Sequence, residues 1–383
     1  TTKEKIAAEA KAKARKGGNE AMDVGMFGSE KDQTDLVDMA KAEPKKPSRL
    51  GQGLSDLMGK SGGQAKAVET VAAGAKAPTE TATPQQKLVD RLLGEGFKGI
   101  LDARKFAKEN GLDGSNKEID ETVERAVVTA ARQIVAEGKD PSETFHALVA
   151  LYGRQPNLAS RTGTSVANQA YSTPMPLAYL ASRLAGAATA DVVYEPTAGN
   201  GALLMEAGPG NDAVYANEID PDRAAALEGF GFTVSQEDGS EPRKIEQPAD
   251  AIVANPPFGA VKEGGQSRVF KVGDWNTTQI DHAVSLHALD NLTANGRAVL
   301  ILGGTKSEAT EERRKDYRGK AKREFYARLY KDYNVTDHFT VSGDLYTKQG
   351  ASWPVDVIVI DGRGASERKL PAAQPPEILK TWD

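Results

Sequence analysis

The sequence predicts an α/β protein with a seven-stranded, doubly wound sheet, preceded by a small helical unit and a low-complexity N-terminal tail. Three observations support this prediction. Short β-branched runs alternate with helical stretches after about residue 190, a Gly-rich turn follows the first run, and an Asn-Pro-Pro-Phe turn follows the fourth. Such alternation is typical of a mostly parallel sheet covered by helices.

Length and composition limit the possible functions. The chain has 383 residues, more than a single domain of roughly 100–200 residues usually holds. It has no cysteine, which excludes a disulfide framework, a Cys-ligated metal and a thiolate nucleophile such as C5-cytosine methylation needs. A net charge of -5 gives no global attraction for a polyanion, so nucleic-acid binding would need a local basic surface. Because no apolar run approaches the roughly 20 residues that cross a bilayer, we predict a cytoplasmic protein without a membrane partner.

Residues 1–84 form the predicted tail, which we expect to be disordered. Ala, Lys, Glu, Gly and Ser dominate it, and it offers too few apolar side chains to offset the entropy of ordering. One segment, Gly53 to Ser61, looks like a phosphate-binding loop. It has five residues between its glycines where that motif needs four, and no strand precedes it, so we reject nucleotide triphosphate binding there.

Residues 85–156 form the predicted helical unit. Apolar residues recur there every three or four positions, and Gly-containing breaks near 111–115 and 138–142 divide the segment into about three helices. The sheet domain is predicted over 157–364, and a Pro-containing tail over 365–383. The expected strands are 191–195, 213–217, 232–236, 249–254, 297–303, 335–341 and 355–361.

The first strand runs into a Gly-rich turn with Gly199 and Gly201, which we expect to open a helix near Ala202. Such a turn lies at the carboxyl edge of a doubly wound sheet, where a nucleotide-type ligand can approach the backbone. Glu218 ends the next strand about 20 residues later, where an acid accepts hydrogen bonds from ribose hydroxyls. Asp238 follows the third strand and is placed to accept from an adenine amino group.

The fourth strand ends in Asn255-Pro256-Pro257-Phe258. The prolines fix φ and lack backbone donors, so this turn can present oxygen acceptors without a competing N–H. The Asn255 side-chain oxygen and the Pro256 carbonyl would accept the two protons of an exocyclic amino group, and Phe258 offers a face for a planar ring. The pattern therefore predicts a site that holds an amino nitrogen for attack on an electrophile.

These motifs, in this order, resemble those of the S-adenosylmethionine-dependent amino-methyltransferases, in particular the N6-adenine DNA branch. The segment Asn168 to Pro174 resembles the motif that borders the methionine end of the cofactor in that branch. The resemblance covers about residues 157–364 and implies a Rossmann-like methyltransferase sheet, S-adenosylmethionine as cofactor, and DNA with a flipped adenine as substrate. It implies these catalytic residues: Asn255, Pro256, Pro257 and Phe258. It implies these cofactor-binding residues: Tyr171, Thr173, Glu195, Pro196, Ala198, Gly199, Gly201, Glu218, Ile219 and Asp238.

More narrowly, residues 333–339 and the following segment to Ile358, expected as final hairpin strands, resemble the methyltransferase domain of phage and plasmid strawberry-notch-like proteins, including DarB-type antirestriction proteins. That resemblance implies antirestriction or DNA modification, virion association with delivery into a host cell, and a helicase domain or partner outside this chain. The chain departs from the adenine branch because only a Pro-rich tail follows the last strand, where a target-recognition domain is usual.

Alternatives stay open at this point. The substrate nitrogen could belong to a protein glutamine or an RNA base, although Phe258 favours DNA adenine over the Tyr usual in glutamine enzymes. A non-catalytic virion component with the same fold is a third reading. His282 and His287 lie five apart, the wrong spacing for one helix face, so no metal site is predicted. Acidic residues are interspersed in the basic cluster from Arg313 to Arg323. The cluster is therefore predicted to be a solvent-exposed helix face more than a phosphate-binding surface.

Overall fold

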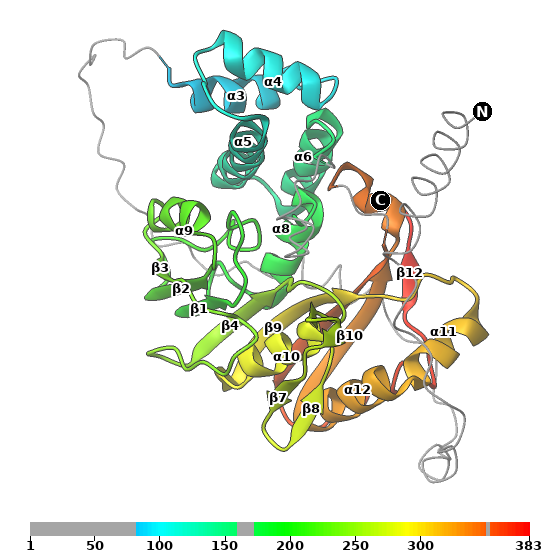
Figure 1. The fold of residues 1–383 in the computed structure, drawn as a ribbon. Helices are drawn as coiled ribbons and strands as arrows, with labels where there is room; N and C mark the ends of the chain where they lie inside the picture. The colour runs from blue at the N-terminus through cyan, green and yellow to red at the C-terminus, as the bar shows by residue number, and fades with distance from the viewer. Residues whose placement is uncertain (1–81, 159–171, 350–352) are drawn as a thin grey trace, which may run out of the picture. The chain divides into compact units, whose positions relative to one another are not determined.

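The computed structural model describes residues 82–158, 172–349 and 353–383 (Figure 1). The predicted N-terminal tail up to residue 81, the segment that looks like a phosphate-binding loop, and Tyr171 lie outside these residues. The helices are α3 (Pro84–Leu93), α4 (Ile100–Glu109), α5 (Asn116–Ala136), α6 (Pro141–Arg154), α8 (Met175–Ala185), α9 (Pro221–Glu228), α10 (Ile280–Leu289), α11 (Thr310–Arg318), α12 (Lys320–Asp332) and the 3-10 helix η2 (Gly343–Gln349).

The strands form one large sheet and two short hairpins. The sheet strands are β1 (Val192–Glu195), β2 (Ala213–Asn217), β3 (Thr233–Ser235), β4 (Ala249–Ala254), β9 (Leu292–Gly303), β10 (Tyr333–Val341), β11 (Val355–Arg363) and β12 (Glu377–Leu379). The hairpin strands, inserted between β4 and α10, are β5 (Lys262–Glu263), β6 (Gln266–Ser267), β7 (Phe270–Val272) and β8 (Trp275–Thr277).

The strand order is β12-β10-β11-β9-β4-β1-β2-β3. Strands β3, β2, β1, β4 and β9 pair in parallel, and β11 lies antiparallel between β9 and β10. The predicted doubly wound, Rossmann-like sheet is therefore confirmed, with all seven expected strands present. The chain leaves β1 toward β2 and β3 and returns on the other side at β4, so β1 and β4 flank the switch point where such sheets bind ligands.

Alternating side chains explain why the central strands lie between two layers. In β9, Val299 and Ile301 belong to one hydrophobic cluster, while Leu300 and Leu302 belong to a second one on the opposite face. Because successive side chains of a strand point to opposite faces, an uninterrupted apolar run fills both. Helix α8 and the helices of 84–154 contribute to the first cluster, and α10 and α12 to the second.

The N-terminal helical unit contains four helices, α3 to α6, where the sequence predicted about three. The additional break follows α3 at Gly94 to Gly99. Gly96 adopts φ 75°, and a Cβ there would lie 2.5 Å from the Cβ of Arg154 at the end of α6. The chain therefore turns after α3, where Gly96 lies directly against the end of α6. The periodicity of apolar residues does not predict this tertiary contact. The predicted boundary between the helical unit and the sheet domain stays a prediction.

Three further details differ from the sequence predictions. Residues 202–206 form turns instead of a helix, because β2 begins soon after them and Arg132 of α5 donates to the carbonyls of Leu204 and Ala207 at 2.7 and 3.0 Å. The segment 343–349, expected as part of a hairpin strand, is the 3-10 helix η2. In the C-terminal tail, Glu377–Leu379 adds an eighth strand parallel to β10.

Among the described helices, none is both long and apolar enough to span a membrane.

Candidate active site

A cavity of about 290 Å³ lies where the first four parallel strands end. Most of the predicted site residues line it: Thr173, Glu195, Pro196, Ala198, Gly199, Glu218, Ile219, Asp238, Asn255, Pro256, Pro257 and Phe258. Gly201 does not line the cavity, and Tyr171 lies outside the described residues. Residues that are distant in sequence therefore meet at one edge of the sheet, because the carboxyl ends of parallel strands point the same way.

Glu218 holds the Gly-rich turn in place. The backbone N–H of Gly199 donates to Glu218 Oε2 at 2.7 Å, and the N–H of Asp220 donates to Oε1 at 2.9 Å. Gly199 has φ 55° and Gly201 φ 77°, and a Cβ on Gly201 would lie 2.8 Å from Leu227 Cδ2. Gly201 thus serves close packing of the turn on α9. Each carboxylate oxygen of Glu218 keeps a lone pair for a ligand hydroxyl.

Glu195, at the end of β1, carries a buried carboxyl. Its side chain is 2% exposed, and Oε2 accepts no hydrogen bond from the residues that the structure describes. Burial, assisted by the negative charge of Glu218, raises the pKa of Glu195 well above its usual value. An unsatisfied acid of this kind favours a cationic or hydrogen-bond-donating ligand.

Ile219 and Asp238 define another part of the cavity wall. Ile219 is 61% exposed although it is a large apolar residue, and it lines the cavity, where it offers a surface to a flat ring. Asp238 Oδ1 accepts from the N–H and the hydroxyl of Ser240, and its Oδ2 lies 3.0 Å from Arg268 Nη1. Although burial would raise the pKa of Asp238, the bonds from Ser240 and Arg268 hold it below the usual value.

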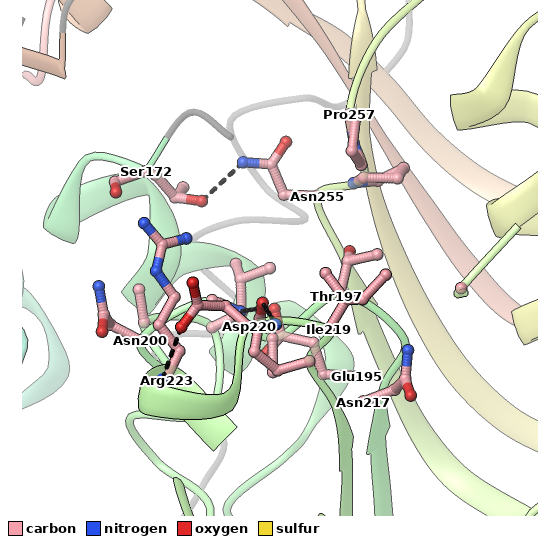
Figure 2. A pocket seen from close by; sticks show the side chains of 18 of the residues that line it. Ser172, Glu195, Thr197, Asn200, Asn217, Ile219, Asp220, Arg223, Asn255 and Pro257 are labelled. Carbon is pink, nitrogen blue, oxygen red and sulfur yellow. Dashed lines mark hydrogen bonds between the residues drawn. The ribbon is translucent and has the colours of Figure 1, made fainter. Parts of the chain in front are cut away.

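Asn255 presents an unpaired oxygen to the cavity. Its Nδ2 donates to Thr173 Oγ1 at 2.7 Å, and this bond fixes the orientation of the amide. A dashed line at Asn255 marks the bond in Figure 2. Its Oδ1 is buried and has no hydrogen-bond partner among the described residues. A buried amide oxygen without a donor is costly, so this atom is arranged to accept from a ligand N–H.

The aromatic residue of the same turn rests on the sheet. A Cβ placed on Gly303 of β9 would lie 3.4 Å from the Cβ of Phe258, so Phe258 lies directly against this glycine. The next residue, Gly259, donates its N–H to Asp281 Oδ1 at 3.2 Å and accepts from the N–H of Ile280 at 2.9 Å. The start of α10 thus fixes the position of the turn.

The cavity also contains residues that sequence reasoning did not select. Asn217 bonds the carbonyls of Pro196 and Glu237 and so joins the loops after β1 and β3. Asn200 donates to Glu124 of α5 at 3.0 Å. Asn200 and Asn217 stand within or beside motifs that the sequence singled out, and that position could have identified them. Nothing in the sequence indicates that α5, more than 70 residues upstream, would supply Glu124.

The basic cluster and the histidines that the sequence analysis considered lie outside the cavity, and contacts within the fold account for Arg313 and His282. Arg313 of the basic cluster is buried and donates to the carbonyl of Pro376 at 2.6 Å and to Thr340 at 2.8 Å, so it is not part of a solvated helix face. His282 stacks on Phe325 with ring centroids 4.0 Å apart. Within the described ranges, no group of three or more His, Cys, Asp or Glu side chains is arranged to hold a metal ion.

Comparison with known proteins gives only distant similarities. No family model matches the chain. No curated protein matches it. Among solved structures, it is similar to a modification subunit assigned to a type I restriction enzyme of Vibrio vulnificus, with 16% identity, 69% of this chain and 54% of that chain covered, and a TM-score of 0.42. It is also similar to a protein of Listeria monocytogenes assigned as a class I S-adenosylmethionine-dependent methyltransferase, with 11% identity, 78% and 93% coverage, and a TM-score of 0.43.

A third similar structure is assigned as an RNA methyltransferase of Pyrococcus horikoshii, with 19% identity, 57% and 98% coverage, and a TM-score of 0.37. This chain spans little more than half the length of the Vibrio modification subunit. At such identities and TM-scores, the fold is established by the strand order, and the function must be argued from the cavity itself.

Proposed function

We propose that this protein transfers a methyl group from S-adenosylmethionine to an amino nitrogen, namely N6 of adenine in DNA. One observation carries the proposal. Among the residues that the structure describes, Asn255 Oδ1 is a buried acceptor without a partner at the switch point of the sheet, and Thr173 orients it. A polar atom left in this state favours a ligand that donates a proton to it.

The cavity has the features that the proposed cofactor needs. Glu218 has acceptor capacity for ribose hydroxyls, Ile219 and Asp238 would contact the adenine ring, and Glu195 offers a buried acceptor. When bound, S-adenosylmethionine would supply a methyl group whose C–S bond breaks as the new N–C bond forms, leaving a neutral thioether, and the methylated nitrogen would then release one proton to water. Acidic residues that line the cavity outnumber the cationic ones, which suits a cofactor with a net positive charge: Glu121, Glu124, Glu195, Glu218, Asp220, Glu237 and Asp238, against Lys117 and Arg223.

The Asn255 turn would bind the amino group and direct its lone pair. Asn255 Oδ1 and the Pro256 carbonyl would accept the two amino protons, and positive charge that develops on the nitrogen would strengthen both bonds. Phe258 would stack on the base. A base inside a duplex cannot present its amino nitrogen to a buried methyl group, so the adenine must be flipped out of the helix.

The wider biological role follows from the sequence resemblance and not from the cavity. Antirestriction or DNA modification in a phage, and a helicase domain or partner outside this chain, stay predictions. Phe258 supports adenine over a protein glutamine. The glutamine and RNA-base alternatives are therefore kept as outcomes of the experiment.

The experiment supplies the full chain with S-adenosylmethionine that carries an isotopically labelled methyl group. Its substrates are duplex DNA, the same duplex without adenine, RNA and a glutamine peptide, and mass spectrometry identifies the product. We expect N6-methyladenine from adenine-containing DNA alone. Asn255→Ala should lower this product by orders of magnitude, while Asn276→Ala, an exposed asparagine of β8, should leave it unchanged.

A second variant isolates the stacking role. Phe258→Leu keeps an apolar side chain against Gly303 but removes the ring, so DNA capture should weaken by about 1–3 kcal/mol, the usual value of an aromatic–base stack. Methylation of the peptide or the RNA without methylation of DNA would replace adenine with that substrate. Wild-type levels of N6-methyladenine in Asn255→Ala would exclude the proposed role of the turn.

A further inference from the structure

Arg223 of α9 is an unpaired cation inside an acidic cavity. Within the described part of the chain, no carboxylate forms an ion pair with its guanidinium, and its Nε is buried without a partner. Burial alone would lower the pKa of Arg223, but the nearby carboxylates of Glu124, Glu218, Glu121 and Asp220 raise it above the usual value. Arg223 is therefore a charged group in a cavity with donors that the fold does not use.

Glu124 and Asn200 lie at the same end of the cavity. Glu124 accepts from the hydroxyl of Ser172 and from Asn200 Nδ2 at 3.0 Å. Asn200 is 7% exposed, and its Oδ1 is buried with no partner in the described ranges. Figure 2 shows the Arg223 side chain extending from α9 toward Ser172 and Asn200. Acceptors for a cation and donors for an anion thus line one end of one cavity.

This combination suits a zwitterion better than a phosphate. A phosphodiester brought to Arg223 would also face Glu121, Glu124 and Asp220, which repel it. An α-amino acid group avoids this conflict, because its carboxylate can pair with the guanidinium while its ammonium donates to the surrounding oxygens. The charges of the cavity and the charges of such a group are complementary.

We propose that Arg223, Glu124 and Asn200 bind the amino-acid end of the cofactor, with Arg223 on its carboxylate and Glu124 and Asn200 Oδ1 on its ammonium. This inference rests on the proposed function, since it names residues for the same cofactor. It gives α5 a direct part in ligand binding: the helical unit supplies one wall of the cofactor site.

Two ligands separate this role from a structural one. S-adenosylhomocysteine carries the amino-acid group, and methylthioadenosine shares the nucleoside and the thioether but lacks that group. Calorimetric titration of the full chain should show that Arg223→Gln and Glu124→Gln each lower the affinity for S-adenosylhomocysteine by about 10- to 100-fold. This is the range for a lost charge-assisted hydrogen bond. Both variants should bind methylthioadenosine as the wild type does.

Matched controls are available on the same two helices. Arg125→Gln on α5 and Glu228→Gln on α9 make the same charge changes at residues that do not line the cavity, and neither should change the affinity for either ligand. The inference would be overturned if Arg223→Gln lowered the affinity for both ligands equally. It would also be overturned if neither Arg223→Gln nor Glu124→Gln lowered the affinity for S-adenosylhomocysteine. If the wild type binds neither ligand, the proposed function itself is wrong. If the wild type binds both ligands and the cavity variants bind them equally well, only the inference about Arg223 and Glu124 is wrong.

Discussion

At the scale of single residues, the titration of Glu195 gives a test that needs no ligand. Because the folded-state pKa of Glu195 is raised, the folded protein holds this proton more tightly than the unfolded chain does. The contribution of Glu195 to stability is therefore present at low pH and is lost as pH rises through the folded-state pKa. Gln does not titrate, so Glu195→Gln should match the wild type in acid and melt at a progressively higher temperature than it at alkaline pH.

Thermal unfolding followed by circular dichroism from about pH 5 to pH 9 would measure this difference. Glu228→Gln, an exposed acid on α9, is the control and should show no growing difference. A difference in melting temperature that stays constant over the whole range would show that Glu195 is already ionised in the folded protein at low pH.

The sequence predicted the site best at the ends of the strands. Glu195, Glu218 and Asn255 each end or follow an apolar run, and parallel pairing alone brings such positions to one edge. It could not show that Thr173 orients the Asn255 amide, because that bond joins residues 82 positions apart. It also could not place Glu124, since α5 reaches the cavity only through tertiary packing.

At the scale of elements, the segment after the Gly-rich turn shows how a tertiary contact overrides a local prediction. The sequence predicts a helix from about Ala202, yet residues 202–206 form turns, and the carbonyls of Leu204 and Ala207 accept from Arg132. The guanidinium of Arg132 also lies 4.5 Å from the ring centroid of Phe230. One partly buried arginine of α5 thus satisfies carbonyl groups that a helix would have satisfied internally.

Arg132→Met should therefore lower the free energy of unfolding by about 1.5–3 kcal/mol, the usual value of hydrogen bonds to a charged group. Met keeps most of the apolar contact with Phe230 but donates no hydrogen bond. Urea denaturation would measure the change, with Arg125→Met on the same helix as a control. A loss no larger than that of the control would mean that the turn after Gly201 does not depend on Arg132.

At the scale of the whole molecule, the C-terminal residues join the sheet to the helical unit. Trp382 lies near the rings of Phe145 and Tyr152 of α6, with centroid separations of 6.4 and 5.9 Å. Residues of α3, α5 and α6 share one hydrophobic cluster with β1, β9 and β11. The described residues belong to one compact unit by their contacts, although the sequence predicts two domains within them.

We expect calorimetry to show one cooperative transition for this unit, since removal of the helices would expose the shared cluster. Trp382→Ala should shift that transition to lower temperature. The free energy of unfolding should fall by about 1–3 kcal/mol, because two aromatic pairs are lost. Two separate transitions in the wild type, or an unchanged transition in Trp382→Ala, would mean that the helical unit folds independently of the sheet.

The most direct test of the proposed site is a calorimetric titration of S-adenosylhomocysteine into the wild type, Glu218→Ala and Asn255→Ala. We predict one binding site in the wild type and an affinity lower by one to two decades in Glu218→Ala, roughly the 1.5–3 kcal/mol of hydrogen bonds to a charged acceptor. Asn255→Ala should bind nearly as the wild type does, because its oxygen serves the substrate amino group. Absence of binding in the wild type, or unchanged affinity in Glu218→Ala, would contradict the assignment of this cavity to the cofactor.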